Sequence, residues 1–331
     1  MNTLVRPALR VRGLSVSFPM ERGEIPAVRH VDLDVPRGEL VALLGESGSG
    51  KSVTARAVMG LAGAGAVVTA DELTLGDTDL RTASPRALRE LRGQRMSLVL
   101  QDALSALNPV LTIGDQLGEL FRVHSGASRK VALARAVDLL GLVGISAPRQ
   151  RVADYPHQFS GGMRQRILIA MAIALEPELL IADEPTTALD VTVQAQILDL
   201  LDSLRTQLDM GVLLITHDLA VVSEVADRLA VMYAGRVVEA GEADAVLRRP
   251  SHPYTEALLR SVPQLEHHGA DLFTIPGAPP NPADVPSGCP FHPRYHRVVD
   301  RCSTIRPELL PVAGRSVACH QSEVMLGEHV G

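Results

Sequence analysis

The stretch of sequence that decides the fold is Leu40-Val41-Ala42-Leu43-Leu44-Gly45-Glu46-Ser47-Gly48-Ser49-Gly50-Lys51-Ser52. The opening run, Leu40–Leu44, is wholly apolar, which predicts a strand buried on both faces of a sheet. The following residues, Gly45–Ser52, fit the pattern G-x-x-x-x-G-K-[ST] and are called the glycine loop below. An Ala-rich helix is predicted over Ser52–Met59. Strand, loop and helix in this order predict the start of a parallel α/β fold.

The glycine loop has the chemistry of a phosphate site. Gly45, Gly48 and Gly50 let successive backbone N–H groups turn inward, and the following helix adds the positive end of its dipole. Lys51 is expected to pair with β and γ phosphates, and Ser52 to ligate Mg²⁺. The alternative is a glycine-rich loop that only turns a strand into a helix.

A second apolar run, Leu179–Ala182, ends in two acids. Asp183 is expected to hold Mg²⁺, usually through water, and Glu184 to polarise the water that attacks the γ phosphorus. Two acids after a strand are often a solvated loop, but ligands bind at the carboxyl ends of strands in open α/β sheets. Together with the glycine loop, these acids predict a P-loop nucleoside triphosphatase.

The rest of the chain divides into recognisable segments. Two β-like runs, Leu14–Phe18 and Val31–Val35, flank a turn-rich stretch around Pro19–Pro26. Helical spacing dominates Gln101–Leu175, which predicts a helical insert. The clearest helices within it are Val131–Leu142 and Gly162–Leu175. After it we expect a helix over Val193–Leu208 and a strand over Val212–Thr216. Proline becomes frequent from Pro250 onward, so we expect a main domain over 1–250 and a C-terminal extension over 251–331.

Composition excludes several classes of protein. The chain has 331 residues and a net charge of −6, which argues against a general nucleic-acid binder because such proteins need a basic surface. Its longest apolar stretch, Ile167–Leu175, falls far below the roughly 20 residues of a membrane-spanning helix. Met1–Leu14 contains no secretory signal. We therefore expect a protein that stays in the cytosol.

A third motif narrows the class. Phe159-Ser160-Gly161-Gly162-Met163-Arg164-Gln165-Arg166 resembles L-S-G-G-x-x-Q-R, the signature of ABC ATPases, with Phe in place of Leu. The resemblance implies that the signature binds the γ phosphate of ATP held by a second subunit, so that two chains sandwich two ATP molecules. The residues given this role are Ser160, Gly161, Gly162 and Gln165. The alternative is an ordinary helix capped by Ser160.

The remaining motifs appear in the order of that family, over about residues 9–248. Gln101 resembles the glutamine that senses Mg²⁺ and the attacking water, and His217 resembles the switch histidine. Asp190, in Ala188-Leu189-Asp190, resembles the acid of the loop that crosses the dimer interface. Phe18 resembles the aromatic residue that stacks on adenine, although a core Phe is a close alternative.

The resemblance thus implies an ABC ATPase fold, a mixed sheet core with an inserted helical subdomain at about 101–175, and ATP hydrolysis. The implied ATP contacts are Phe18, Gly45, Glu46, Ser47, Gly48, Ser49, Gly50, Lys51 and Ser52. The implied catalytic residues are Gln101, Glu184 and His217, and the implied Mg²⁺ ligands are Ser52, Gln101 and Asp183.

Other segments are similar to the ATPases of oligopeptide, dipeptide and nickel importers. They are Ser105-Ala106-Leu107-Asn108-Pro109, Asp183–Gln196 and His252–Leu259, while Met163 and Thr186-Thr187 favour the first member of the usual ATPase pair. This implies a heterodimer with a second ABC ATPase in preference to a homodimer. It also implies two integral membrane permease subunits, an external solute-binding protein, a peripheral location on the cytoplasmic face of the plasma membrane, and peptides or nickel chelates as cargo. The alternative is a soluble ABC ATPase that acts on nucleic acid or ribosomes.

In that family four cysteines of the extension often ligate a [4Fe-4S] cluster. Cys289, Cys302 and Cys319 occupy three of the positions, but Tyr295 stands where the second cysteine is usual. Thiolate and imidazole are both competent ligands, so His292, His296 or His320 are candidates for the fourth. The alternative is a degenerate site with inert thiols.

Overall fold

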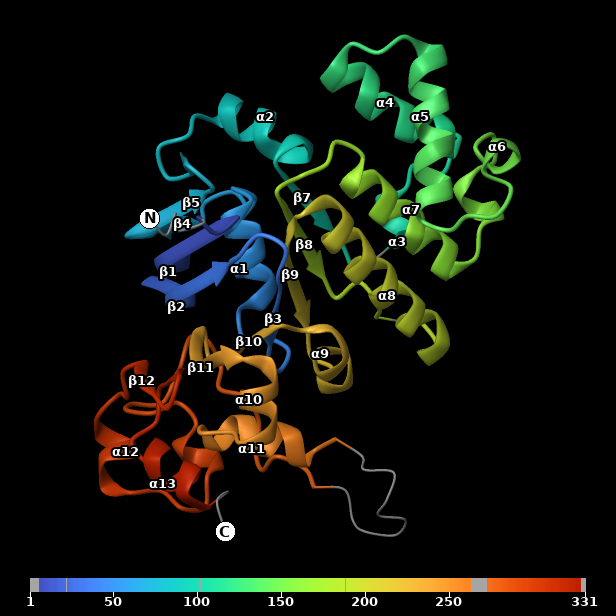
Figure 1. Cartoon of the computed structure of the whole chain (residues 1–331). Helices are drawn as coiled ribbons and strands as arrows, with labels where there is room; N and C mark the ends of the chain where they lie inside the picture. Colours follow the sequence, from blue (N-terminus) through green and yellow to red (C-terminus); the bar gives the residue numbers. More distant parts are fainter. Residues whose placement is uncertain (1–5, 22, 102, 188, 263–272, 329–331) are drawn as a thin grey trace, which may run out of the picture. The chain divides into compact units, whose positions relative to one another are not determined.

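The computed structural model describes residues 6–21, 23–101, 103–187, 189–262 and 273–328 (Figure 1). These residues form two compact units, each assembled from separate segments of the chain. The first unit takes in Val35–Gly38 and Thr82–Leu214, and the second takes in Leu9–Asp34, Glu39–Arg81 and the chain from Ile215 onward. The expected α/β class is confirmed, because both units combine strands with helices.

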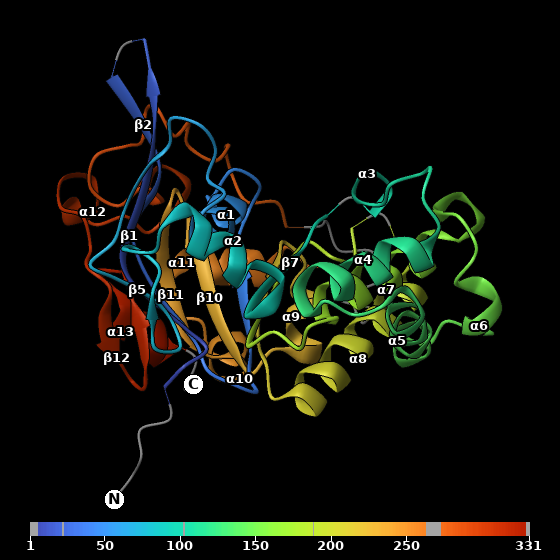
Figure 2. The same ribbon diagram turned by 90° about the horizontal axis from the view of Figure 1, so that it is seen from above.

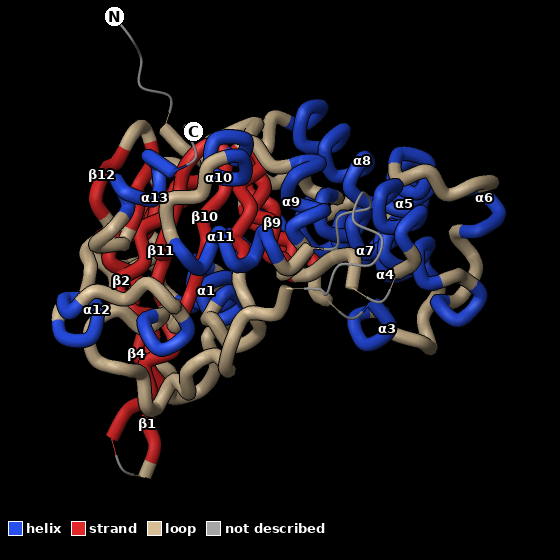
Figure 3. The backbone as a smooth tube through the Cα atoms, turned by 90° about the horizontal axis from the view of Figure 1, so that it is seen from below, coloured by secondary structure: helices blue, strands red, loops and turns tan. Residues whose placement is uncertain are grey.

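The first unit contains a short parallel layer of strands. β8 (Leu179–Asp183) pairs in parallel with β7 (Met96–Val99), and β9 (Gly211–Thr216) is its other neighbour. Every residue of β8 is buried, as expected for an apolar strand with neighbours on both edges. The helices of this unit are α2 (Pro85–Gln94), α3 (Ala103–Ala106), α4 (Ile113–Ser125), α5 (Arg129–Leu142), α6 (Pro148–Arg151), α7 (Gly161–Ile173) and α8 (Val191–Leu208). Figure 3 shows α4, α5, α6 and α7 gathered in one helical group.

Local capping side chains fix where these helices begin. Thr112, Ser128, Ser160 and Asp190 precede α4, α5, α7 and α8, and each side chain accepts a hydrogen bond from a backbone N–H three residues further on. Such a cap satisfies one of the N–H groups that a helix leaves without an intrahelical partner. The starts of these helices are therefore encoded next to the helices themselves.

The second unit contains an antiparallel sheet and a mixed strand layer. β1 (Leu9–Met20) lies between β2 (Gly23–Val35) and β5 (Glu72–Leu75), with β4 (Val67–Thr69) and β6 (Thr78–Asp79) at the margins. Figure 2 shows β1 and β2 side by side. In the other layer β3 (Leu40–Leu44) runs parallel to β10 (Arg228–Tyr233), which pairs antiparallel with β11 (Arg236–Glu242). The helices α1 (Lys51–Val58), α9 (Leu219–Val225) and α10 (Ala243–Arg248) belong to this unit.

The C-terminal extension belongs to the second unit and shares its core. Tyr254 and Phe291 pack in one apolar cluster with Ala42, Leu44 and Val231. The extension also widens the strand layer, because its strand β13 (Arg315–Val317) pairs antiparallel with β11. Its elements are α11 (Pro253–Arg260), the 3-10 turn His292–Arg294, α12 (Asp300–Thr304), β12 (Leu310–Val312), β13 (Arg315–Val317) and α13 (Ser322–Glu328).

Most predicted elements are confirmed to within two residues, among them β3, β8, β9 and α8. The turn-rich stretch at Pro19–Pro26 is wrong in extent, because β1 continues to Met20 and β2 resumes at Gly23. Antiparallel pairing overrides the local turn residues there, and the Ser17 hydroxyl donates to Glu24 Oε2 at 2.6 Å across the hairpin.

Candidate functional site

Close packing and backbone conformation together require glycine at several positions of the glycine loop, which joins β3 to α1. A Cβ atom on Gly45 would lie 2.2 Å from the carbonyl oxygen of Met232 in β10. Gly48 and Gly50 have φ values of 79° and 106°, in the left-handed region that favours glycine. Only glycine therefore allows the loop to lie this close to β10 and to turn into α1.

Lys51 lies inside the glycine loop. Its side chain is 5% exposed, and its Nζ donates to the carbonyl oxygens of Gly45 at 2.6 Å and Glu46 at 3.0 Å. Ser49 is also buried, Ser47 is exposed, and Ser52 lies in the first turn of α1. An ammonium group and the N-terminus of a helix converge on one loop, which is the arrangement that binds phosphate.

The acidic end of β8 is organised within the first unit. Asp183 is 5% exposed, while Glu184 has a φ of 50°, in the left-handed region that non-glycine residues rarely adopt. Glu184 Oε2 accepts hydrogen bonds from Gln101 Nε2 at 3.1 Å and from Thr187 Oγ1 at 3.0 Å. The structure thus brings together Gln101 and Glu184, which lie 83 positions apart. Backbone strain of this kind persists at functional sites because the surroundings hold it in place.

Thr187 is a contact that sequence reasoning missed as a site residue. It served only as a marker of relatedness, yet its hydroxyl orients the Glu184 carboxylate. The signal in the sequence was the spacing of Thr187, three residues after Glu184, the acid that follows β8. In the structure the Thr187 N–H also donates to the Glu184 carbonyl at 3.3 Å, which closes a turn. A turn of this kind returns the side chain at its fourth position toward the first.

Ser160, Gly161 and Gly162, called the serine-glycine cap below, form the start of α7. Ser160 Oγ accepts from the Met163 N–H at 3.3 Å, and both Ser160 and Gly161 are exposed. A Cβ atom on Gly162 would lie 2.5 Å from Cγ1 of Val193 in α8, so the two helices approach closely there. The N-terminus of α7 therefore presents exposed N–H groups that suit a phosphate.

The other signature and interface residues differ in exposure. Asp190 is exposed and caps α8, accepting from the Val193 N–H at 2.9 Å. Gln165 is 3% exposed, and its Nε2 has no hydrogen-bond partner within the described part of the chain. The Gln165 side chain is therefore buried here, and its contact with a phosphate stays a prediction. Ala188, quoted with Asp190, lies outside the described residues.

The two remaining predicted residues belong to the second unit. His217 is exposed directly after β9, where Asp218 caps α9 by accepting from the Ala220 N–H at 2.8 Å. Phe18 is half-buried near the end of β1. These positions leave the His217 side chain and part of the Phe18 ring accessible to a ligand.

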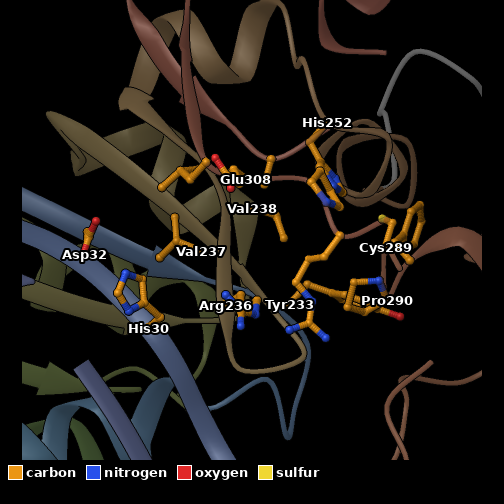
Figure 4. Close-up of a pocket in the computed structure, with 15 residues that line it drawn as sticks. His30, Asp32, Tyr233, Arg236, Val237, Val238, His252, Cys289, Pro290 and Glu308 are labelled. Atoms are coloured by element: carbon orange, nitrogen blue, oxygen red, sulfur yellow. The ribbon is translucent and has the colours of Figure 1, made fainter. Parts of the chain in front are cut away.

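The extension lines a cavity of about 430 Å³ within the second unit. Figure 4 shows His30 and Asp32 on one side of it and Cys289 and Pro290 on the other. Burial raises the pKa of the Cys289 thiol, and burial raises the pKa of Cys319 to about 11. Without a bound metal both thiols are therefore neutral at physiological pH, and coordination would have to displace their protons.

The three thiols do not form a metal ligand set in this structure. Among the described residues, no group of three or more His, Cys, Asp or Glu side chains has a metal-holding arrangement. His292 Nδ1 lies 2.9 Å from the Cys289 carbonyl and His320 Nε2 lies 2.9 Å from the Ile305 carbonyl. Tyr295 packs its ring against Phe291, and its hydroxyl donates to Met325 Sδ at 3.6 Å. The residues present do not fit the iron-sulfur cluster.

Comparisons with known proteins agree with this geometry. Residues 28–187 match the ABC transporter family, and residues 238–302 match the oligopeptide/dipeptide transporter C-terminal region. A putative peptide import ATP-binding protein of Brucella melitensis is 50% identical, over 93% of this chain and 94% of that protein. The dipeptide transport ATP-binding protein DppD of Bacillus subtilis is 49% identical, over 90% of each chain.

A solved structure shows the same fold. It is the dimeric post-hydrolysis state of an ATP-binding cassette bound to ADP and Pi, which is 26% identical and superposes with a TM-score of 0.62. The superposition covers 71% of this chain and 98% of that chain. The chain therefore belongs to the ABC transporter family, as one of its ATP-binding and ATP-hydrolysing subunits.

Proposed function

We propose that this ATPase energises a membrane importer of di- or oligopeptides by closing and opening a nucleotide-sandwich dimer. Relatives at about half identity over most of the chain are named for peptide import, and the extension matches a region specific to such transporters. The observation that carries the proposal is the oriented carboxylate of Glu184, held by Gln101 and Thr187 at the end of β8. Nickel chelates remain a second class of cargo.

Within this proposal Glu184 is the catalytic base that polarises the attacking water, with Gln101 orienting both. Lys51 exchanges its two carbonyl partners for phosphate oxygens when ATP enters the glycine loop. His217 contacts the γ phosphate, and Phe18 stacks on adenine. These roles follow the family resemblance, and the exposure of Gln101 and His217 supports theirs.

The donor set fits Mg²⁺ by its chemistry. Ser52, Gln101 and Asp183 can each supply an oxygen ligand, since Gln101 Nε2 is hydrogen-bonded to Glu184, and Mg²⁺ prefers hard oxygen ligands. When bound, Mg²⁺ neutralises charge on the β and γ phosphates. An iron-sulfur cluster has no part in the proposed mechanism, because the thiols of the extension do not fit it.

We propose that the serine-glycine cap of one subunit grips the ATP held by the glycine loop of its partner. The exposure of Ser160, Gly161 and Asp190 supports this assembly. We prefer a second, related ATPase as the partner, with two permease subunits and a solute-binding protein completing the importer at the cytoplasmic face of the plasma membrane. No helix in the described ranges has both the length and the apolar character needed to span a bilayer.

The domain boundaries remain part of the proposal. We assign an ATPase domain to 1–250, with the helical insert at about 101–175, and a peptide-importer extension to 251–331. The match of 238–302 to the transporter C-terminal region supports a boundary in this part of the chain. The β11–β13 ladder supports an extension that is integrated with the second unit.

The substitution Glu184→Gln tests the function. ATP turnover should fall at least about 100-fold, because the general base is lost, while ATP binding persists. Gel filtration with ATP should show a trapped dimer. Asp244→Asn, an exposed acid at the start of α10, is the control and should hydrolyse ATP at the wild-type rate. Unchanged turnover in Glu184→Gln would remove Glu184 from its role, and turnover insensitive to peptide-loaded binding protein in the purified importer would contradict peptide import.

A further inference from the structure

The glycine loop is tied to the extension by a charged contact. Arg294 Nη1 donates to Glu46 Oε2 at 2.7 Å and Arg294 Nη2 donates to Glu46 Oε1 at 3.1 Å. The pair joins residues 248 positions apart, and the arginine side chain is only 5% exposed. A bidentate arginine-carboxylate pair fixes geometry as well as charge.

The guanidinium of Arg294 is itself held in place. Its Nε donates to the Pro276 carbonyl at 2.8 Å, and its Nη1 also lies 3.3 Å from the Tyr233 hydroxyl. Burial works to lower the pKa of Arg294, but the hydrogen bonds to Glu46 and Tyr233 outweigh it and raise that pKa above its ordinary value. Arg294 therefore keeps its charge and cannot easily leave Glu46.

A second contact reaches the backbone of the same residue. The Glu46 N–H donates to the Tyr254 hydroxyl at 2.9 Å. Tyr254 is fully buried, and its ring packs against Tyr233 and Phe291 with centroid distances of 4.5 and 5.4 Å. Because its ring cannot shift without disturbing this cluster, the hydroxyl is a fixed acceptor for the loop.

The charge of Glu46 gives these contacts a consequence for nucleotide binding. A carboxylate within a phosphate loop repels the anionic ligand, and the repulsion is strong where solvent is partly excluded. Glu46 is only partly exposed. Arg294 neutralises that carboxylate and holds it in one position.

We propose that Arg294 and Tyr254 are positioning residues of the nucleotide site, through which the extension holds the glycine loop in its phosphate-binding shape and neutralises Glu46. The inference rests on the proposed role of the loop in ATP binding. Both residues act through Glu46, which they contact directly. The extension is thus a requirement for tight ATP binding.

Equilibrium binding of ATP to the full chain tests the proposal. Arg294→Met should weaken ATP affinity about tenfold, because the Glu46 carboxylate keeps its charge but loses the cation that neutralises it and holds it in position. The double variant Arg294→Met with Glu46→Gln should recover to within about threefold of wild type, since the repulsive charge is gone. Tyr254→Phe, which removes only the hydroxyl, should weaken affinity about fivefold.

Arg315→Met is the matched control. Arg315 is another buried arginine of the second unit, and its Nη1 lies 3.5 Å from Glu239 Oε1 in β11. It should lower thermal stability as Arg294→Met does, but leave ATP affinity unchanged. If the contact between Arg294 and Glu46 served stability alone, Arg294→Met and Arg315→Met would have the same ATP affinity.

Each outcome has a distinct reading. Wild-type ATP affinity in both Arg294→Met and Tyr254→Phe, or a double variant no better than Arg294→Met, would overturn the inference while leaving the proposed function standing. If Arg294→Met does not fold, the isosteric Tyr254→Phe decides alone. A wild-type chain that binds no ATP, indistinguishable from Lys51→Ala, would remove the proposed function and the inference with it.

Discussion

The glycine loop and the serine-glycine cap both bind phosphate in the proposed mechanism, but they are supported in different ways. The loop is held by Tyr254 and Arg294, which lie 208 and 248 positions from Glu46 along the chain. The cap is held by its own next turn, through the bond from the Met163 N–H to Ser160. The two motifs are equally clear in the sequence. The loop nevertheless depends on contacts with residues far along the chain, whereas the cap depends on a contact within its own turn.

The two regions also differ in exposure. Lys51 and Ser49 of the loop are buried, whereas Ser160 and Gly161 of the cap are exposed. A buried loop receives most of its contacts from its own chain. An exposed cap suits a ligand presented by another molecule, which is the role that the sandwich dimer gives it.

The largest effect is expected from Gly45→Ala, which breaks the loop alone. The new Cβ would lie 2.2 Å from the backbone carbonyl oxygen of Met232, which cannot easily move aside. We expect ATP binding to be lost and the free energy of unfolding to fall by about 1–3 kcal/mol. Calorimetry and ATP titration measure both.

Gly63→Ala, outside the glycine loop, is the control for this experiment. Gly63 has a positive φ of 105°, but nothing lies within 4 Å of its Cβ position, so only the backbone penalty of about 1 kcal/mol applies and ATP affinity should be unchanged. Equal ATP affinity in Gly45→Ala and wild type would contradict the packing explanation.

A smaller effect is expected from Gly162→Ala, which breaks the cap alone. Its Cβ would lie 2.5 Å from Val193 Cγ1, so α7 and α8 must separate slightly. Turnover should fall about tenfold while each chain still binds ATP through its glycine loop, because a displaced cap misplaces its N–H groups. Steady-state hydrolysis and equilibrium binding, measured separately, show the split.

A second variant sharpens that result. Combining Gly162→Ala with Val193→Ala should restore turnover. Loss of ATP binding in Gly162→Ala would mean that the cap and the loop are not independently supported.

The smallest expected effect is on the pH dependence of stability, through His252, which contacts the backbone of Tyr254, a residue that contacts the glycine loop. Burial lowers the pKa of His252 from its ordinary value of 6.5 to about 3. Because the unfolded chain takes up a proton that the folded chain refuses, stability is lost as pH falls below about 6.5, by about 1.4 kcal/mol per pH unit. Denaturant unfolding should show about 2 kcal/mol of this loss between pH 7 and pH 5.

His252→Asn isolates that contribution. Asn keeps a side-chain acceptor for the Tyr254 N–H, which His252 Nδ1 accepts at 3.0 Å, but it does not titrate. Glu239, whose pKa burial raises, opposes the effect because its contribution falls as pH rises, and it is present in both proteins. An identical pH slope in the two proteins would rule out His252 as the source.

Strands and helices with strong local signals could be predicted. Leu40–Leu44 forms β3 as expected, and Gly162–Leu175 corresponds to α7 within two residues. The extent of the β1–β2 hairpin could not be predicted from the sequence. Cross-strand pairing decides how far the strands continue past residues that favour turns. The strands of the extension were also missed, because β12 and β13 are only three residues long and gain their stability from pairing.

By itself, the sequence determined the motifs whose chemistry is local: the glycine loop, the serine-glycine cap and the acids that end β8. Backbone geometry and capping act over a few residues, so the pattern is sufficient there. Only the tertiary structure decided which partners hold them, such as Gln101 and Thr187 on Glu184, or Arg294 and Tyr254 on Glu46. The physical reason is that hydrogen bonds and ion pairs depend on separation in space, which packing of the whole unit sets and spacing along the chain does not.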